Sequence, residues 1–286
     1  MRVIVSEKIG FCQGVENAVR GTCEALKTYE SVQVSGQIVH NHLICSELVE
    51  MGLKVHPDNV LPQPLTEDSV ALIRAHGIDL ESENELKKRF PRVLDFTCPI
   101  VSSVFQLAER LDRQGYIVVV LGKKQHPEIR ALVSRINRHF LVEDLKDLDQ
   151  VIGELKKDEK KVALISQTTT DTEKFGQTQA FLEKELGKRI KVFDTICRFT
   201  KERESAARHL AHEADLVIVV GAPNSSNTMK LVNIVKNAGT CAILVEDSQD
   251  LSNLTLPETV GLISGTSAST EQVQKILDNI EKVARR

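Results

Sequence analysis

The polar loops of this chain recur three times at nearly constant spacing. Cys12, Cys98 and Cys197 each follow a short apolar run, and 86 residues separate the first two cysteines and 99 the last two. Two other sets of loops keep a similar spacing. They lie at residues 37–41, 122–128 and 221–227, and at residues 73–77, 165–169 and 263–267. Self-similarity of this kind predicts one structural unit that occurs three times.

Apolar, β-rich runs alternate with amphipathic helical stretches along the whole chain. Strands are expected at residues 3–6, 32–35, 70–74, 93–96, 117–121, 162–165, 192–194, 216–220, 242–245 and 260–263. Helices are expected at residues 15–29, 100–114, 172–186, 201–213, 229–238 and 270–284. A helix is also expected directly after each loop of the first repeated set. This alternation predicts an α/β fold with mainly parallel sheets covered by helices.

The repeat also predicts the division into domains. Loops at the carboxyl ends of parallel strands converge on a shared crevice, so three such units facing inward would surround a central cavity. We therefore expect three pseudo-equivalent α/β domains at residues 13–97, 98–196 and 197–286. Because Cys12 follows the first strand and Cys197 begins the last third, residues 1–12 are expected to complete the third domain.

The charge and hydropathy of the chain exclude several kinds of partner. With 37 basic and 40 acidic residues, the formal net charge of −3 provides no positive field for nucleic acid or an anionic membrane. Apolar runs are shorter than the roughly 20 residues of a membrane span. The apolar stretch at residues 1–6 is too short for the hydrophobic region of a secretory signal. A cytoplasmic protein with no nucleic-acid or membrane partner is expected.

The cysteines favour a metal or catalytic role over disulfides. There are six in 286 residues, without a CxxC pair. Three thiolates at one point could hold an iron–sulfur cluster with one iron left open. Zinc held by three cysteines and a histidine, or three unrelated buried thiols, are the alternatives at this point. Cys23, Cys45 and Cys241 fall outside the repeat and are expected to be buried structural thiols.

Two loops have the composition of anion sites. Residues 224–227 and 265–269 offer small polar side chains and backbone amides just before helices. Such helix N-termini bind phosphate, although Ser, Thr and Asn are also ordinary helix caps. His40 and His76 occupy the corresponding loops nearer the N-terminus. Each could donate to phosphate oxygens or serve as a structural hydrogen-bonding group.

His126-Pro127-Glu128 is the candidate for acid–base chemistry. Proline at the start of a helix would fix the backbone so that His126 and Glu128 are presented together. A carboxyl group beside a diphosphate and away from water should hold its proton more tightly, which suits it to deliver protons. The alternative is a glutamate that only stabilises the helix dipole.

Together these motifs resemble the 4-hydroxy-3-methylbut-2-enyl diphosphate reductase (LytB-type) family, which catalyses the last step of the non-mevalonate isoprenoid pathway. The resemblance covers nearly the whole chain. The matching motifs lie at residues 10–15, 39–41, 75–77, 97–99, 126–128, 167–169, 196–197, 224–227 and 265–268.

The resemblance implies an oxygen-sensitive 4Fe-4S cluster on Cys12, Cys98 and Cys197, with an open iron that binds the substrate hydroxyl. This hydroxyl leaves as water, with two electrons and two protons consumed, and isopentenyl and dimethylallyl diphosphates are released. Ferredoxin or flavodoxin would supply the electrons. Glu128 would supply the proton, with Thr168 and His126 in its network. The residues implied to bind the diphosphate substrate are His40, His76, His126, Thr168, Ser225, Ser226, Asn227 and Ser267.

The chain departs from the usual family pattern at two places. Residues 129–134 stand where Val-x-Gly-Thr-x-Gly is usual, and residues 198–204 stand where Ala-Thr-x-x-Arg-Gln is usual, with Thr200 and Arg203 retained. The departures introduce four charged residues, Arg130, Arg198, Glu202 and Glu204. Charge near a pocket changes what the pocket accepts. One alternative is thus a paralogous iron–sulfur reductase or dehydratase with another hydroxylated anionic substrate, and a second is a non-catalytic iron–sulfur sensor or anion-binding protein.

Overall fold

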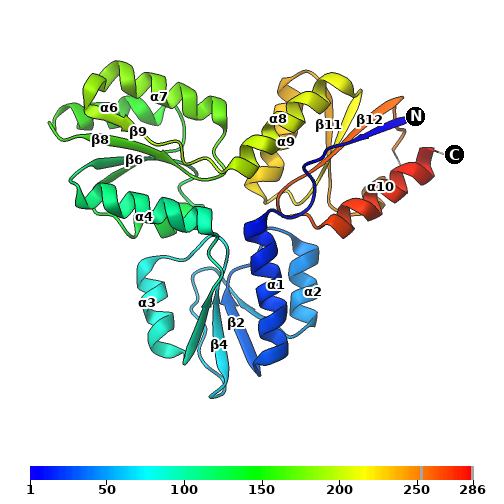
Figure 1. Cartoon of the computed structure of the whole chain (residues 1–286), viewed down its shortest axis with the longest axis horizontal. Coiled ribbons are helices and arrows are strands. Elements are labelled where there is room, and N and C mark those ends of the chain that lie inside the picture. The colour runs from blue at the N-terminus through cyan, green and yellow to red at the C-terminus, as the bar shows by residue number, and fades with distance from the viewer. Residues whose placement is uncertain (252–253, 285–286) are drawn as a thin grey trace. The chain divides into compact units, whose positions relative to one another are not determined.

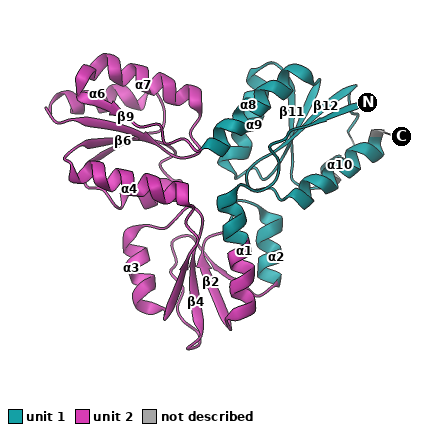
Figure 2. Ribbon diagram, in the orientation of Figure 1, with its two compact units in different colours: residues 1–19, 38–50, 198–286 teal, residues 20–37, 51–197 magenta. Residues whose placement is uncertain are grey.

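The computed structural model describes residues 1–251 and 254–284 (Figure 1). The chain divides into two compact units (Figure 2). The first comprises residues 1–19, 38–50 and 198–286, and the second comprises residues 20–37 and 51–197. Within the third expected domain, residues 252–253 and 285–286 lie outside the described residues. The expected domain boundaries near residues 13, 98 and 197 stay a prediction.

The first unit contains one parallel sheet with strand order β1-β12-β10-β11. Its strands are β1 (Arg2–Val5), β12 (Thr259–Ser264), β10 (Leu216–Val220) and β11 (Cys241–Val245). The helices of this unit are α2 (His42–Glu50), α8 (Arg198–Glu213), α9 (Ser226–Asn237) and α10 (Thr270–Ala284), with a short 3-10 helix η2 (Ser248–Leu251). Helix α1 (Gln13–Thr28) begins in the first unit and ends in the second.

The second unit contains two parallel sheets. One has the order β3-β2-β4-β5 and consists of β3 (Lys54–His56), β2 (Ser31–Ser35), β4 (Ser69–Ile73) and β5 (Arg92–Asp95), with helix α3 (Leu80–Arg89). The other has the order β7-β6-β8-β9 and consists of β7 (His139–Val142), β6 (Ile117–Leu121), β8 (Val162–Ser166) and β9 (Ile190–Val192). Its helices are α4 (Pro99–Arg113), α5 (Pro127–Val133), α6 (Asp147–Lys156), α7 (Thr172–Leu186) and the 3-10 helix η1 (Gly187–Arg189).

All three sheets have the same connectivity. In each sheet, one inner strand lies between the two strands that follow it along the chain. Thus β2 lies between β3 and β4, β6 between β7 and β8, and β10 between β11 and β12. The remaining edge position is filled by β5, β9 or β1, and every strand pair in the described residues is parallel. The prediction of an α/β fold with parallel sheets and flanking helices is therefore confirmed.

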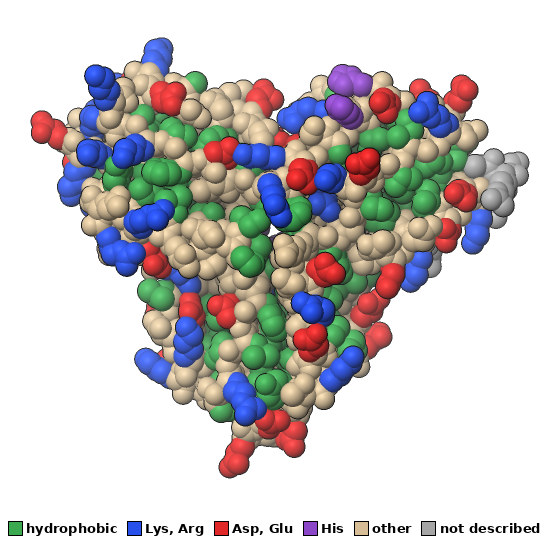
Figure 3. Space-filling view, viewed as in Figure 1, with side chains coloured by type: hydrophobic (Ala, Val, Ile, Leu, Met, Phe, Trp, Pro, Cys, Tyr) green, Lys and Arg blue, Asp and Glu red, His purple; other side chains and the backbone are tan. Residues whose placement is uncertain are grey.

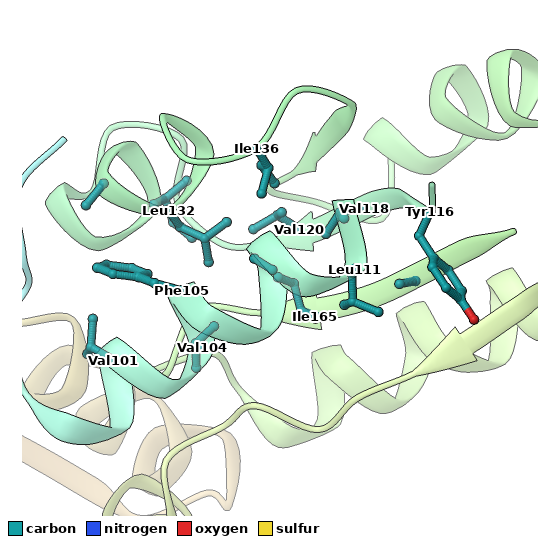
Figure 4. Packing of buried hydrophobic residues seen from close by; sticks show 14 residues of the cluster. Val101, Val104, Phe105, Leu111, Tyr116, Val118, Val120, Leu132, Ile136 and Ile165 are labelled. Carbon is teal, nitrogen blue, oxygen red and sulfur yellow. The ribbon is translucent and has the colours of Figure 1, made fainter. Parts of the chain in front are cut away.

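The sheet around β6 shows why these strands are apolar on both faces. Val118 and Val120 pack with α4 and α5 (Figure 4). Val119 and Leu121 pack with α6 and α7 on the other face. Successive side chains of a strand point to opposite faces, and helices cover both faces of a parallel sheet. Burial of apolar side chains on both sides then holds the ends of the strands, and the loops beyond them, in place.

The structure contains two strands that the sequence pattern did not predict. Both β3 and β7 are short edge strands, and their sequences mix apolar with basic residues. Helices α3 and α6 were also missed. In α3 only Leu86 is buried, so the apolar periodicity that identifies a helix is weak there.

Charges of both signs are interspersed on the face of the protein seen in Figure 3. The mixed surface agrees with the small net charge. Across residues 1–251 and 254–284, every helix is too short or too polar to cross a lipid bilayer.

Candidate active site

Each repeated cysteine lies between an edge strand and the first residue of a helix. Cys12 follows β1 and directly precedes α1, Cys98 follows β5 and directly precedes α4, and Cys197 follows β9 and directly precedes α8. All three are half-buried. Cysteine binds metal as the thiolate.

The backbone of each cysteine is tied to the loop that follows the neighbouring strand. The three N–H groups donate to carbonyl oxygens of the second repeated loop set. These bonds join Cys12 to Thr266 at 3.2 Å, Cys98 to Ala75 at 3.0 Å and Cys197 to Thr168 at 2.9 Å. The repeat seen in sequence is therefore a repeat of local geometry, and each cysteine is held beside a loop that carries a predicted substrate-binding residue.

The donor set fits an iron–sulfur cluster. The cysteines form no disulfide within the described residues, and the repeat provides three thiolates with the same backbone setting. Three thiolates can hold three irons of a cubane cluster and leave the fourth open, whereas a structural zinc site needs a fourth protein ligand. Cys98 and Cys197 belong to the second unit and Cys12 to the first.

The other three cysteines differ from one another. Cys45 is buried, as expected, and its thiol donates to the Val39 carbonyl at 3.2 Å. Burial raises the pKa of this thiol. Cys23 is half-buried and Cys241 is exposed, so the expectation of a buried thiol was wrong for Cys241. Cys241 is the first residue of edge strand β11, where the strand has not yet entered the core.

Glu128 and Thr168 are joined by two hydrogen bonds within the second unit. Glu128 lies in the first turn of α5 and is 1 % exposed. One carboxylate oxygen accepts the Thr168 N–H and the other accepts the Thr168 hydroxyl, each at 2.7 Å. Burial raises the pKa of Glu128 to about 7, against the lowering effect of these two bonds. A carboxyl group with a pKa near neutral can both hold and release a proton at physiological pH.

His126 is the N-terminal cap of the same helix. Its Nδ1 accepts the N–H of Glu128 at 3.2 Å, so the neutral ring carries its proton on Nε2. The ring of His76 meets that of His126 edge to face, with 5.3 Å between the centroids. The second unit therefore brings together four of the predicted residues, namely His76, His126, Glu128 and Thr168.

The first unit contains the other predicted substrate-binding residues. Ser225 is the N-terminal cap of α9, and its hydroxyl accepts the N–H of Thr228 at 3.3 Å. Ser226 is the first residue of this helix and is half-buried. His40, also half-buried, lies in the loop before α2.

Asn227 and Ser267 carry buried polar atoms that the fold leaves unsatisfied. Asn227 is 3 % exposed and Ser267 is 4 % exposed. Neither the amide atoms of Asn227 nor the Ser267 hydroxyl has a hydrogen-bond partner in residues 1–251 and 254–284. Leaving a buried polar group unpaired costs about 1–3 kcal/mol. Such atoms are suited to bind a polar ligand that supplies the missing partner.

The four charged residues at the departures from the family pattern are solvated or paired. Arg130 and Arg198 are exposed. Glu202 pairs with Lys8 at 3.1 Å. The buried Glu204 pairs with Lys230 at 2.7 Å, between α8 and α9. Solvent screens the two exposed arginines, and the two glutamates are compensated by lysines.

Several residues that support the site were not among the predicted ones. Asp95 and Asp194 each lie three residues before a cysteine, and each carboxylate accepts the N–H two residues on, from Thr97 at 2.8 Å and Ile196 at 3.1 Å. This repeated Asp-x-x-Cys turn is visible in the sequence. Thr195, in the second of these turns, ties the turn to the end of β8. Its hydroxyl accepts the N–H of Ser166 and donates to the carbonyl of Ser166, each at 2.7 Å.

The comparisons with known proteins agree over nearly the full chain. The sequence model of the family described as LytB protein matches residues 3–281. A protein of Kosmotoga olearia named 4-hydroxy-3-methylbut-2-enyl diphosphate reductase is 45% identical over 98% of this chain and 95% of its own length. A protein of the same name from Thermotoga maritima is 36% identical over 99% of this chain and 97% of its own length.

Two solved structures share the fold. One is the E-1-hydroxy-2-methyl-but-2-enyl-4-diphosphate reductase of Plasmodium falciparum, with a TM-score of 0.86 and 25% identity, over 97% of this chain and 87% of that one. The other is described as (E)-4-hydroxy-3-methyl-but-2-enyl diphosphate reductase, the terminal enzyme of the non-mevalonate pathway. It has a TM-score of 0.69 and 29% identity, and covers 99% of this chain and 100% of that one.

Proposed function

Since the chain belongs to the LytB protein family, we propose that it is a reductase of 4-hydroxy-3-methylbut-2-enyl diphosphate. The reaction breaks the carbon–oxygen bond of the allylic hydroxyl group. Two electrons and two protons are consumed, water leaves, and isopentenyl or dimethylallyl diphosphate remains. The chain must therefore bind a diphosphate, receive electrons and deliver a proton to a leaving hydroxyl.

We propose that Cys12, Cys98 and Cys197 hold a 4Fe-4S cluster. When bound, such a cluster would supply electrons and an open iron acting as a Lewis acid toward the hydroxyl oxygen. Support comes from the family and from the common position of the three cysteines, each at a helix N-terminus with its N–H bonded to a neighbouring loop. Ferredoxin or flavodoxin is the proposed electron donor. Because such clusters are oxygen-sensitive, a reducing cytoplasmic location is proposed.

Glu128 is the proposed proton donor, and its contact with Thr168 is the observation that carries this assignment. With a pKa of about 7, the carboxyl group is partly protonated at neutral pH. The Thr168 hydroxyl can donate to the carboxylate or accept from the carboxylic acid, so it can pass a proton onward. His126 accepts the backbone N–H of Glu128 through its Nδ1 and so fixes the start of the helix that carries Glu128.

The proposed diphosphate ligands are His40, His76, His126, Thr168, Ser225, Ser226, Asn227 and Ser267. Three of these are imidazoles, which can donate to phosphate oxygens and become cationic beside a negative charge. Asn227 and Ser267 provide buried polar atoms without partners in the described part of the chain. The N-terminus of α9 adds backbone N–H groups and the positive end of a helix dipole.

The test is conversion of the hydroxylated allylic diphosphate by anaerobically purified holoenzyme with a reduced electron donor. The Glu128→Gln variant should keep its iron and sulfide and lose turnover by a factor of about 10² or more. Glu154→Gln, which alters an exposed glutamate of α6 in the same unit, is the matched control and should turn over normally. Absence of conversion by cluster-loaded wild-type protein would exclude the proposed reaction.

A further inference from the structure

The side chain of Asn41 joins two loops of the first unit. Asn41 is 0 % exposed. Its amide group donates to the carbonyl of Ser267 at 2.7 Å and to the side-chain oxygen of Gln272 at 2.9 Å. Its own side-chain oxygen accepts the N–H of Ile44 at 3.2 Å. Both donors of this buried amide are therefore in use, and its oxygen accepts one bond.

The two ends of this connection carry proposed diphosphate ligands. Asn41 directly follows His40, at the start of α2, whereas Ser267 lies between β12 and α10. The helices α2 and α10 both belong to the first unit (Figure 2). The backbone of Ser267 is thus fixed by the amide of Asn41, while its hydroxyl stays without a partner in the described residues. A fixed backbone with an available hydroxyl is the arrangement that a preorganised ligand-binding residue requires.

A second contact makes the connection rigid. Gln272, in the first turn of α10, accepts from Asn41 and donates to the backbone carbonyl of Glu246 at 2.7 Å. Gln272 is 8 % exposed, and its backbone N–H bonds to the Ser269 hydroxyl at 3.0 Å. The start of α10 is therefore held both to Asn41 and to the segment after β11. Several buried hydrogen bonds that converge on two side chains favour one loop conformation over others.

We propose that Asn41 is a positioning residue that sets the Ser267 loop relative to His40 so that both can bind the diphosphate of the substrate. This inference rests on the proposed function. Helix capping alone does not account for the contacts, because capping of α2 uses only the side-chain oxygen. The amide nitrogen donates to Ser267 and Gln272, and these two bonds hold the Ser267 loop.

The Asn41→Ser variant separates these two roles. A serine oxygen can still cap α2, but serine lacks the two amide donors. The measurement is binding of inorganic diphosphate to anaerobic holoenzyme by calorimetry, together with steady-state kinetics on the allylic diphosphate. We expect Kd and KM to rise about tenfold, with kcat and iron content unchanged within a factor of about two. Asn41→Asp, which keeps the cap and places a carboxylate against two acceptor oxygens, should weaken binding at least as much.

The control is Asn137→Ser, which removes an exposed amide that donates to Asp112 at 2.8 Å. It should bind diphosphate as the wild type does. Combination with Ser267→Ala supplies a second check, since loss of the Ser267 hydroxyl should cost less in the Asn41→Ser background than in the wild type.

Wild-type affinity in both Asn41 variants would overturn the inference, and so would a fall in kcat and iron content at constant KM. Failure of wild-type holoenzyme to bind diphosphate or to turn over the substrate would instead overturn the proposed function. The two failures are therefore distinguishable.

Discussion

Thr168 binds both oxygens of the Glu128 carboxylate, one through its backbone N–H and one through its hydroxyl, at 2.7 Å each. The two residues follow different strands of one sheet, since Glu128 is in the first turn of α5, after β6, and Thr168 follows β8. The bonds favour the charged carboxylate, whereas burial favours the neutral acid. Burial is the larger effect, and the pKa of Glu128 is raised to about 7.

The raised pKa of Glu128 predicts how stability depends on pH. Below its ordinary value of 4.5, the group is protonated in both the folded and unfolded states. Between 4.5 and about 7, the folded protein binds this proton more tightly than the unfolded chain does, so the free energy of unfolding falls as pH rises. Above about pH 7 this contribution to the free energy of unfolding, on the order of 3 kcal/mol, is lost completely.

The Glu128→Gln variant lacks this titration and should be more stable than the wild type at pH 8 but not at pH 4.5. Urea denaturation of both proteins across this range measures the difference. The Gln oxygen can still accept the Thr168 N–H, and the Thr168 hydroxyl can turn to accept from the new amide group. Parallel stability curves for the two proteins would contradict the assignment of a raised pKa.

Removing the Thr168 hydroxyl should slow proton delivery while leaving the shape of the site unchanged. Thr168→Val keeps the backbone N–H bond to Glu128 and loses the hydroxyl bond. Because that bond lowers the pKa of Glu128, its loss should raise the pKa further and shift the alkaline limb of the kcat profile to higher pH. Turnover should fall by a factor of about 10 to 10².

Thr178→Val is the matched control for this experiment. Thr178 is also buried, but its hydroxyl donates to a carbonyl within α7, that of Lys174. The Thr178→Val variant should therefore leave both kcat and its pH profile unchanged. An unshifted profile in Thr168→Val would show that the hydroxyl takes no part in the titration.

Replacing each of the repeated cysteines with serine should reduce cluster assembly. Cys12→Ser, Cys98→Ser and Cys197→Ser each remove one proposed thiolate ligand, so anaerobically reconstituted protein should contain well under the wild-type amount of about four irons per chain. Circular dichroism checks that the helices are retained. Cys241→Ser, at an exposed position outside the repeat, should bind iron normally. Full iron content in all three variants would refute the proposed ligand set.

The strands with the strongest signal in the sequence are those buried on both faces. The run Ile117–Leu121 is apolar throughout because helices cover each side of its sheet. The short edge strands β3 and β7 lack this signal, since their sequences mix apolar with basic residues and are not buried throughout. The repeated loops were also visible, because residues after parallel strands recur with the repeat itself.

The contacts between loops could not be predicted. Asn41 and Ser267 are 226 residues apart in the sequence, and their bond depends on where the start of α2 lies relative to the loop after β12. Likewise, the motif around His126 and Glu128 suggests a proton donor, but the sequence does not reveal that both carboxylate oxygens are bonded by one threonine. Residue types indicate the chemistry available, whereas distances decide which groups act together.

The loop that carries His76 is fastened to the end of α5 by Arg135, and breaking this contact should destabilise the second unit. The guanidinium group donates to the carbonyl of Ile78 at 2.8 Å, pairs with Glu83 at 2.5 Å and lies 4.7 Å from the ring of Phe105. The side chain of Arg135 is 8% exposed and that of Glu83 is 17% exposed. Solvent therefore screens this ion pair weakly, and removing one partner leaves a largely buried charge.

Arg135→Gln should lower the free energy of unfolding by about 2–4 kcal/mol. Arg138→Gln is the matched control, because the Arg138 side chain is 49% exposed in its pair with Asp158. It should cost less than about 1 kcal/mol. In a double-mutant cycle measured by urea denaturation, Arg135→Gln and Glu83→Gln should be strongly non-additive, since each already removes the same contact. Additive losses of unfolding free energy in the Arg135 and Glu83 variants would mean that this contact does not hold the loop. Equal losses in the Arg135 and Arg138 variants would mean the same.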